Sequence, residues 1–126
     1  MKILLVEDSK FLRMANERAL VKAGYEVVAV ADGEEGLHVA REQTPDLIML
    51  DMMLPKITGP EVLSQLKADP ATSSIPVIVL TSLSQKNEEK LKEAGAVAYL
   101  EKSALMLDKG SESLVAAIER VMGKLA

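Results

Sequence analysis

Polar side chains with catalytic or metal-binding chemistry directly follow four apolar segments of this chain. In chain order they are Glu7 and Asp8 after KILLV, Asp51 after DLIML, Thr81 and Ser82 after PVIVL, and Glu101 and Lys102 after VAYL. Carboxylates bind hard cations or act as nucleophiles, and lysine and hydroxyl groups stabilise anions. The four groups therefore indicate one site for a charged ligand, provided that the fold brings the four segment ends together.

The elements that must position these residues follow from the apolar pattern. Continuous Val, Ile and Leu runs are typical of parallel strands buried on both faces, and segments with helical periodicity lie between them. Thr58 and Glu61 have capping-box spacing, and Gly24 is a helix stop signal. We predict strands over residues 2–6, 26–30, 46–50, after Pro76 and over 97–100, and helices over 11–23, after Asp32, after Thr58, over 87–94 and over 113–124.

Five repeats of strand then helix predict a doubly wound, flavodoxin-like α/β fold with a parallel sheet of order 2-1-3-4-5 and five helices. We expect a single domain over residues 1–126. In this order the first and third strands are neighbours, which would place Glu7 and Asp8 beside Asp51 at the carboxyl edge of the sheet. Ligands of such sheets bind at that edge.

Composition excludes several classes of protein. A net charge of −4 argues against direct nucleic-acid binding, which needs a basic footprint. The chain has no cysteine, so disulfides, thiolate metal sites and cysteine nucleophiles are excluded. No apolar run reaches transmembrane length and the N-terminal segment lacks a secretory pattern, so we expect a cytoplasmic protein that does not bind membranes.

The three predicted neighbours Glu7, Asp8 and Asp51 have two readings. Three adjacent carboxylates repel one another, and a hard divalent cation relieves that repulsion; Mg²⁺ is the usual choice and Mn²⁺ the alternative. In the structural reading, Asp8 or Ser9 caps the first helix and Asp51 caps a turn. Either cap is adequate for one residue, but three acids at adjacent strand ends favour a cation site.

These motifs resemble, in order and spacing, the receiver domains of bacterial response regulators (CheY-like), the phospho-accepting domains of two-component signalling. The resemblance covers nearly the whole chain. It is carried by the pair Glu7-Asp8, LIMLDMMLP around Asp51, Gly59 eight residues on, VLTS with Thr81 thirty residues after Asp51, and Tyr99-x-x-Lys102.

The resemblance implies that Asp51 is phosphorylated by the phosphohistidine of a sensor kinase or a histidine phosphotransfer protein. It implies Mg²⁺ bound by Asp8, Asp51 and the Met53 carbonyl, with Glu7 acting through water. The phosphoryl-binding and switch residues would be Thr81, Ser82, Lys102 and Tyr99. The surface of the predicted fourth helix (87–94), fifth strand (97–100) and fifth helix (113–124) would then change, regulating an unidentified target or an attached output domain. We expect a monomer or a weak phosphorylation-dependent dimer, with only weak self-phosphorylation and self-dephosphorylation activity.

The chain departs from the family pattern after Lys102, where Ser103 replaces the usual proline. A non-proline cis bond costs about 2.5–4 kcal/mol, so we expect a trans bond there, which would shift the approach of Lys102. The alternative is a strained cis bond that the site holds in place. Residues 103–111 form a longer connection than usual, expected to tuck under a loop; the alternative is a partner-binding surface. Met53 and Leu83 line the family's water path and are apolar here, which predicts slow self-dephosphorylation.

Other residues are expected to be structural. We predict that Met49, Met52 and Met53 pack in the core and its loops, that Phe11 shares the apolar face of the first helix, and that His38 is solvated. Two other functions compete with the signalling switch. One is a phosphatase that uses Asp51 through an aspartyl phosphate; against it, Asp51 is followed by Met52 and Met53, with no acid at those positions for general acid/base catalysis. The other is an interaction module that is never phosphorylated.

Overall fold

Five parallel strands form one sheet in this computed structural model, which describes residues 1–81, 95–101 and 111–125. The strands are β1 (Lys2–Val6), β2 (Glu26–Val30), β3 (Leu47–Asp51), β4 (Val77–Thr81) and β5 (Ala98–Glu101). Their order is β2-β1-β3-β4-β5, and all four pairings are parallel. The predicted doubly wound topology is therefore confirmed, and β1 and β3 lie side by side.

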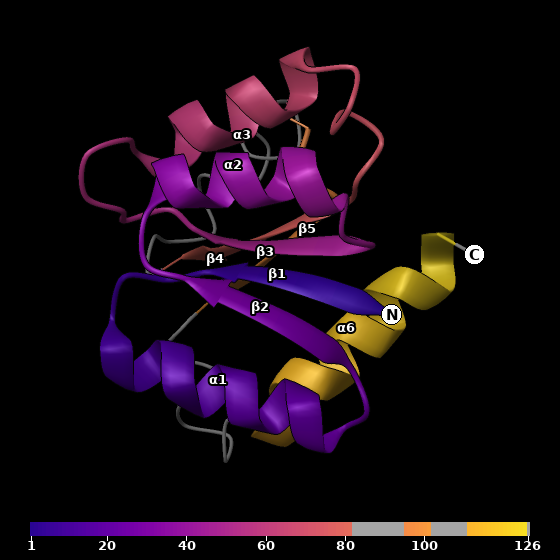
Figure 1. Cartoon of the computed structure of the whole chain (residues 1–126). Helices are drawn as coiled ribbons and strands as arrows, with labels where there is room; N and C mark the ends of the chain where they lie inside the picture. The colour runs from indigo at the N-terminus through magenta and orange to yellow at the C-terminus, as the bar shows by residue number, and fades with distance from the viewer. Residues whose placement is uncertain (82–94, 102–110, 126) are drawn as a thin grey trace.

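Helices cover both faces of this sheet (Figure 1). They are α1 (Lys10–Lys22), α2 (Gly33–Gln43), α3 (Gly59–Ala68) and α6 (Ser111–Leu125). One face is covered by α2 and α3, and the other by α1 and α6. The helix predicted over residues 87–94 lies outside the described residues. Within the described ranges, no helix combines the length and apolarity needed to cross a lipid bilayer.

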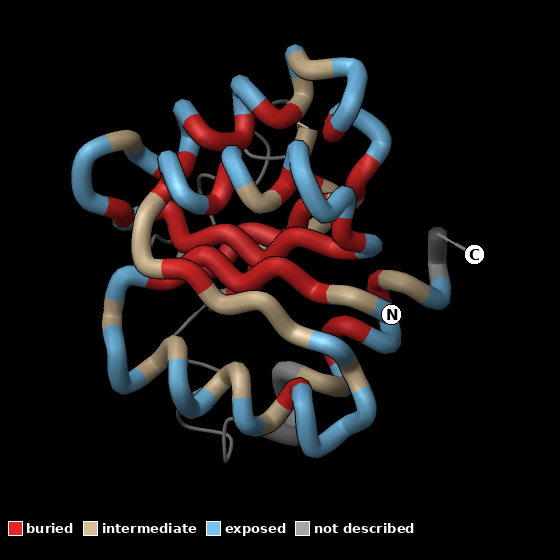
Figure 2. The backbone as a smooth tube through the Cα atoms, viewed as in Figure 1, coloured by how far each residue is buried: buried red, intermediate tan, exposed pale blue. Residues whose placement is uncertain are grey.

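Alternation along each strand divides the core into two layers. In β1, Leu4 and Val6 pack toward α2 and α3, whereas Ile3 and Leu5 pack toward α1 and α6. The central strands β1, β3 and β4 are buried along almost their whole length (Figure 2). Burial on both faces explains why these strands read as unbroken apolar runs in the sequence.

Capping residues start three helices soon after the carboxyl edge of the sheet. The side chain of Ser9 accepts a hydrogen bond from the Leu12 amide (3.4 Å) at α1, and that of Asp32 accepts from the Glu35 amide (2.9 Å) at α2. The predicted Thr58 cap is confirmed, since its hydroxyl accepts from the Glu61 amide (3.4 Å). Each cap replaces backbone partners that the first helical turn lacks.

Several predicted boundaries and one predicted contact were wrong. The third strand begins at Leu47 and includes Asp51, and β5 runs one residue later than predicted. The final helix begins at Ser111, so it takes up the end of the segment expected to be a loop. Phe11 is 74% exposed in the first turn of α1, so helical spacing alone did not indicate burial.

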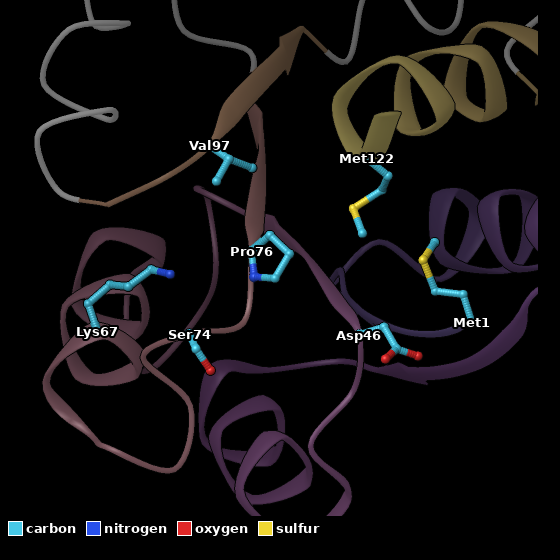
Figure 3. A pocket seen from close by; sticks show the side chains of 7 residues that line it. All are labelled: Met1, Asp46, Lys67, Ser74, Pro76, Val97 and Met122. Atoms are coloured by element: carbon cyan, nitrogen blue, oxygen red, sulfur yellow. The ribbon is translucent and has the colours of Figure 1, made fainter. Parts of the chain in front are cut away.

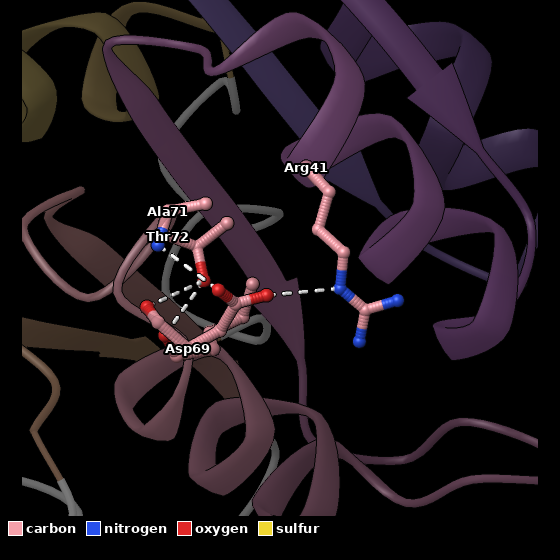
Figure 4. Close-up of polar contacts among 5 residues, drawn as sticks. Arg41, Asp69, Ala71 and Thr72 are labelled. Carbon is pink, nitrogen blue, oxygen red and sulfur yellow. Dashed lines mark hydrogen bonds and ion pairs between the residues drawn. The ribbon is translucent and has the colours of Figure 1, made fainter.

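A polar cluster joins α2 to the turn that follows α3 (Figure 4). The Arg41 guanidinium pairs with the Asp69 carboxylate, with Nε 3.1 Å from Oδ2, and the other carboxylate oxygen accepts from the Ala71 amide (2.9 Å). Thr72 is buried, and its hydroxyl donates to the Leu66 carbonyl (2.7 Å). This turn leads the chain back to the start of β4, at the amino edge of the sheet.

Candidate functional site

Three carboxylates meet where β1 and β3 end. Val6 is in register with Leu50, so the residues that follow them, Glu7 and Asp51, come from adjacent strand ends. Each of Glu7, Asp8 and Asp51 offers a carboxylate oxygen, and these atoms lie within 4.8 Å of one another. The expected juxtaposition is confirmed. Glu7 and Asp51 are fully buried and Asp8 is exposed, so the cluster opens to solvent on one side.

Backbone amides orient two of these carboxylates. The Ser9 amide donates to Glu7 Oε2 (3.1 Å), and the Met53 amide donates to Asp51 Oδ1 (3.0 Å). Ser9 also caps α1. Helix capping and turn formation are therefore present together with the acidic cluster, so the two readings of these residues do not exclude each other.

A half-buried arginine of α1 holds the turn that carries two of the acids. Arg13 Nη1 donates to the carbonyl oxygens of Glu7 (2.9 Å) and Asp8 (3.3 Å). The Glu7 amide also donates to the carbonyl of Val30 (3.1 Å), the last residue of β2. The backbone of this turn is thus tied both to α1 and to the neighbouring strand.

Gly59 lies against the backbone of the other acid. A Cβ at this position would lie 2.6 Å from the Asp51 carbonyl oxygen and 2.5 Å from Met52 Cα. Its amide donates to the Met52 carbonyl (3.2 Å). The absence of a side chain therefore allows α3 to begin directly against the end of β3.

The donor set of the cluster suits a hard cation. It consists of oxygen ligands only, with two buried carboxylates and one exposed carboxylate in a small space. Mg²⁺ and Mn²⁺ prefer such ligands, and Mg²⁺ usually keeps several waters in its coordination shell. The solvent-facing side at Asp8 leaves access for those waters.

Other predicted site residues are placed only in part. The backbone of Thr81 ends β4, next to β3, where Asp51 is in register with Leu80. The Thr81 side chain, Ser82, Leu83, Lys102 and the Lys102–Ser103 bond lie outside what the structure describes. Tyr99 is half-buried in β5, in register with Val79, and packs against the core layer of α2 and α3.

The methionine prediction was correct for two residues and wrong for one. Met49 and Met52 are buried, but Met53 is 63% exposed. Met53 lies two residues after the end of β3, where no described element covers its side chain. His38 is solvated as predicted and pairs with Glu42 one turn along α2 (3.2 Å).

A pocket of about 680 Å³ lies at the opposite, amino edge of the sheet (Figure 3). Its lining residues precede or flank the strand starts: Met1, Asp46, Lys67, Ser74, Pro76, Val97 and Met122. Lys67 Nζ donates to the carbonyls of Ile75 (2.9 Å) and Ser73 (3.2 Å). Burial lowers the pKa of the Lys67 amine from 10.5. None of the three acids lines this pocket.

Sequence reasoning missed Arg13. Side chains of a helix point toward its N-terminus, so a long cation one turn inside α1 reaches back over the preceding turn. That directional rule was the available signal, since Arg13 lies four residues after the Ser9 cap.

The chain matches the family model described as the response regulator receiver domain over residues 3–116. It is 43% identical over 123 residues to the gliding motility regulatory protein of Myxococcus xanthus, covering 96% of this chain and 15% of that protein. It is 41% identical to the polar-differentiation response regulator DivK of Brucella anthropi, covering 79% and 82%. This chain therefore spans less than a sixth of the Myxococcus protein and most of DivK.

Solved structures have the same fold. The chemotaxis response regulator CheY4 of Vibrio cholerae superimposes with a TM-score of 0.86 at 31% identity, covering 95% of this chain and 97% of that one. The receiver domain of the sensor histidine kinase PA1611 of Pseudomonas aeruginosa, described with a magnesium ion coordinated in its active-site cleft, has a TM-score of 0.81 at 31% identity, covering 97% of each chain.

The chain belongs to the response regulator receiver domain family. Members of this family are signalling phospho-acceptors, and membership implies phosphorylation-dependent two-component signalling. Receiver domains interact with histidine kinases or phosphotransfer proteins and with downstream targets.

Proposed function

We propose that this chain is a phosphorylation-driven binding switch in which Asp51 accepts a phosphoryl group in a Mg²⁺-dependent reaction. The observation that carries this proposal is the burial of Asp51 at the carboxyl edge of the sheet, within 4.8 Å of carboxylate oxygens of Glu7 and Asp8. Carboxylates this close repel one another, and their repulsion lowers the stability of the fold. A bound cation would offset that loss. The magnesium-containing cleft of the Pseudomonas relative supports the same choice of ion.

In the proposed reaction, an Asp51 carboxylate oxygen attacks the phosphorus of a phosphohistidine. The new P–O bond forms as the P–N bond breaks, and the imidazole leaves with a proton from solvent. The Met53 amide, bonded to Asp51 Oδ1, fixes the plane of the attacking carboxylate. Mg²⁺ would be held by Asp8, Asp51 and the Met53 carbonyl, with Glu7 acting through water, and would neutralise charge on the phosphoryl oxygens.

The output of the switch would be a change of surface. Thr81, Ser82 and Lys102 would bind the phosphoryl oxygens, and Tyr99 would turn inward as Thr81 moves. The half-buried position of Tyr99 beside the α2 and α3 core layer supports this role, because a ring there has both a buried and an exposed side available. Phosphorylation would favour one of two pre-existing arrangements of the surface formed by the predicted helix over residues 87–94, β5 and α6.

The test is phosphorylation with acetyl phosphate. Intact-mass measurement in Mg²⁺ should show a stable gain of one phosphoryl group on the wild type, and no gain on Asp51→Asn or in EDTA. Rapid multiple turnover of phosphate esters would instead establish the phosphatase. No gain on the wild type under any condition would establish a module that works without phosphorylation.

We also propose that residues 1–126 act as one receiver domain in the cytoplasm. Its partners would be a sensor histidine kinase or histidine phosphotransfer protein and one downstream protein. The domain would be a monomer or a weak phosphorylation-dependent dimer, which size-exclusion chromatography with and without acetyl phosphate tests directly.

The phosphorylated state should be long-lived, because the Met53 side chain can neither position nor activate an attacking water. The exposure of this side chain means that a polar replacement is tolerated by the fold. We predict that Met53→Asn speeds decay of the phosphorylated form severalfold, followed by mass spectrometry after removal of acetyl phosphate. An unchanged decay rate would contradict the prediction. Exposed Met14→Asn, in α1, is the matched control.

A further inference from the structure

We infer that Arg13 is a positioning residue of the cation site: its guanidinium fixes the backbone of Glu7 and Asp8, and thereby sets where their carboxylates meet Asp51. This inference rests on the proposed function, because it assumes that the acidic cluster binds Mg²⁺. It goes further in assigning a role to a side chain that is not itself a ligand.

The contacts of Arg13 are with the backbone of the turn. Its Nη1 donates to the carbonyl of Glu7 at 2.9 Å and to that of Asp8 at 3.3 Å. One nitrogen thus spans two consecutive peptide groups and fixes the orientation of each. Hydrogen bonds from a charged donor are about twice as strong as neutral ones, so this is a firm constraint.

The constraint matters because no residue in the described ranges makes a hydrogen bond or ion pair with the Asp8 carboxylate. Glu7 is fully buried and its carboxylate accepts a bond from the Ser9 amide, whereas Asp8 is exposed. The direction of the Asp8 side chain therefore depends mainly on the peptide groups beside it. Mg²⁺ demands near-ideal octahedral geometry, so a small rotation of this turn moves a ligand out of place.

Charge and positioning by Arg13 affect cation binding in opposite directions. A nearby positive charge repels Mg²⁺, so removal of the charge alone should tighten binding by about twofold at 0.15 M salt, where the Debye length is about 8 Å. Loss of an outer-shell partner of a metal ligand instead weakens binding by roughly 10–100-fold. The sign of the change therefore separates the two roles.

The experiment is calorimetric titration of the whole chain with MgCl₂ at constant ionic strength. We expect Arg13→Met to raise the Mg²⁺ dissociation constant by about 10-fold. Arg13→Lys should show a smaller rise, because lysine retains a cationic donor without the rigid guanidinium fork. Arg18→Met is the matched control: Arg18 is an exposed arginine of the same helix, and its loss should leave binding unchanged or slightly tighter.

Circular dichroism and urea unfolding of each variant, without metal, establish that the fold is retained. If Arg13→Met unfolds, the comparison of Arg13→Lys with the wild type decides. An unchanged or tighter dissociation constant in a folded Arg13 variant overturns the inference while leaving the proposed function intact. A wild type that binds neither Mg²⁺ nor Mn²⁺ overturns the proposed function and this inference with it.

Discussion

The two edges of the sheet differ in the groups that surround their charged side chains. At the amino edge, two charged side chains have polar partners: Asp46 accepts from the Lys2 amide (2.8 Å), and Lys67 donates to two carbonyls. At the carboxyl edge, three like charges converge within 4.8 Å. The hydrogen bonds of Asp46 and Lys67 stabilise the fold at the first edge, whereas the proximity of three acids at the second edge destabilises it. The difference indicates which edge carries function.

The largest effect should come from crowding the carboxyl edge. Gly59→Ala places a methyl group 2.6 Å from the Asp51 carbonyl and 2.5 Å from Met52 Cα, both of them backbone atoms. We expect it to cost about 3 kcal/mol of unfolding free energy in urea titration, at the upper end for overpacking. Gly123→Ala, in α6 with open space around it, is the control and should stabilise by about 0.5–1 kcal/mol. Equal effects of the two substitutions would refute the close approach at Gly59.

Magnesium should stabilise the chain only through the carboxyl edge. At 100 times the dissociation constant, Mg²⁺ should add about 2.7 kcal/mol to the unfolding free energy of the wild type. Asp8→Asn should lose most of this gain and, without metal, be slightly more stable because one like charge is removed. Asp46→Asn makes the same change at the amino edge and should keep the full gain. Loss of the Mg²⁺ stabilisation in both variants would contradict the prediction that Mg²⁺ binds only at the carboxyl edge.

An intermediate effect is expected from the turn that closes the amino edge. Thr72→Val removes the hydroxyl that donates to the Leu66 carbonyl at 2.7 Å in a buried position. The cost should be about 1–2 kcal/mol in urea unfolding, since the acceptor remains buried. Ser64→Ala removes an exposed hydroxyl from α3 and should change stability by less than about 0.5 kcal/mol. The Mg²⁺ affinity of Thr72→Val should equal that of the wild type, and a weakened affinity would contradict the separation.

The smallest effect concerns pH. Because burial lowers the pKa of Lys67 in the folded state, the unfolded chain binds more protons just below pH 10.5. Stability contributed by this residue therefore rises as the pH increases through the folded pKa toward 10.5. We expect the difference in unfolding free energy between wild type and Lys67→Met to change in that direction between pH 8 and 10.5. A difference that is flat or falls with pH would contradict the shift.

Most of the fold could be predicted because buried parallel strands leave an unambiguous trace. Residues 3–6 of β1, 47–50 of β3 and 77–80 of β4 are all apolar because both sheet faces are covered. The starts of two helices were marked by Asp32 and Thr58. The predicted ends of two strands were wrong by one residue, because strand pairing can extend to a polar residue such as Asp51.

The convergence of the acids could also be predicted, because strand order fixes which ends are adjacent. The exposure of Phe11 and Met53 could not, since an apolar type does not reveal whether another element covers it. The role of Arg13 depends on a side chain that crosses back over a turn, and strand and helix patterns carry no such information.

One bond at the site offers a spectroscopic reporter. The Met53 amide donates a hydrogen bond to Oδ1 of Asp51, and its nitrogen lies 3.0 Å from that oxygen. Amide chemical shifts depend strongly on the charge and distance of the acceptor, so this nitrogen–proton pair should resonate at a distinct position when the carboxylate holds a cation or a phosphoryl group. In a ¹⁵N-labelled sample, a single cross-peak would then follow occupancy of the site in real time, with no probe attached to the protein.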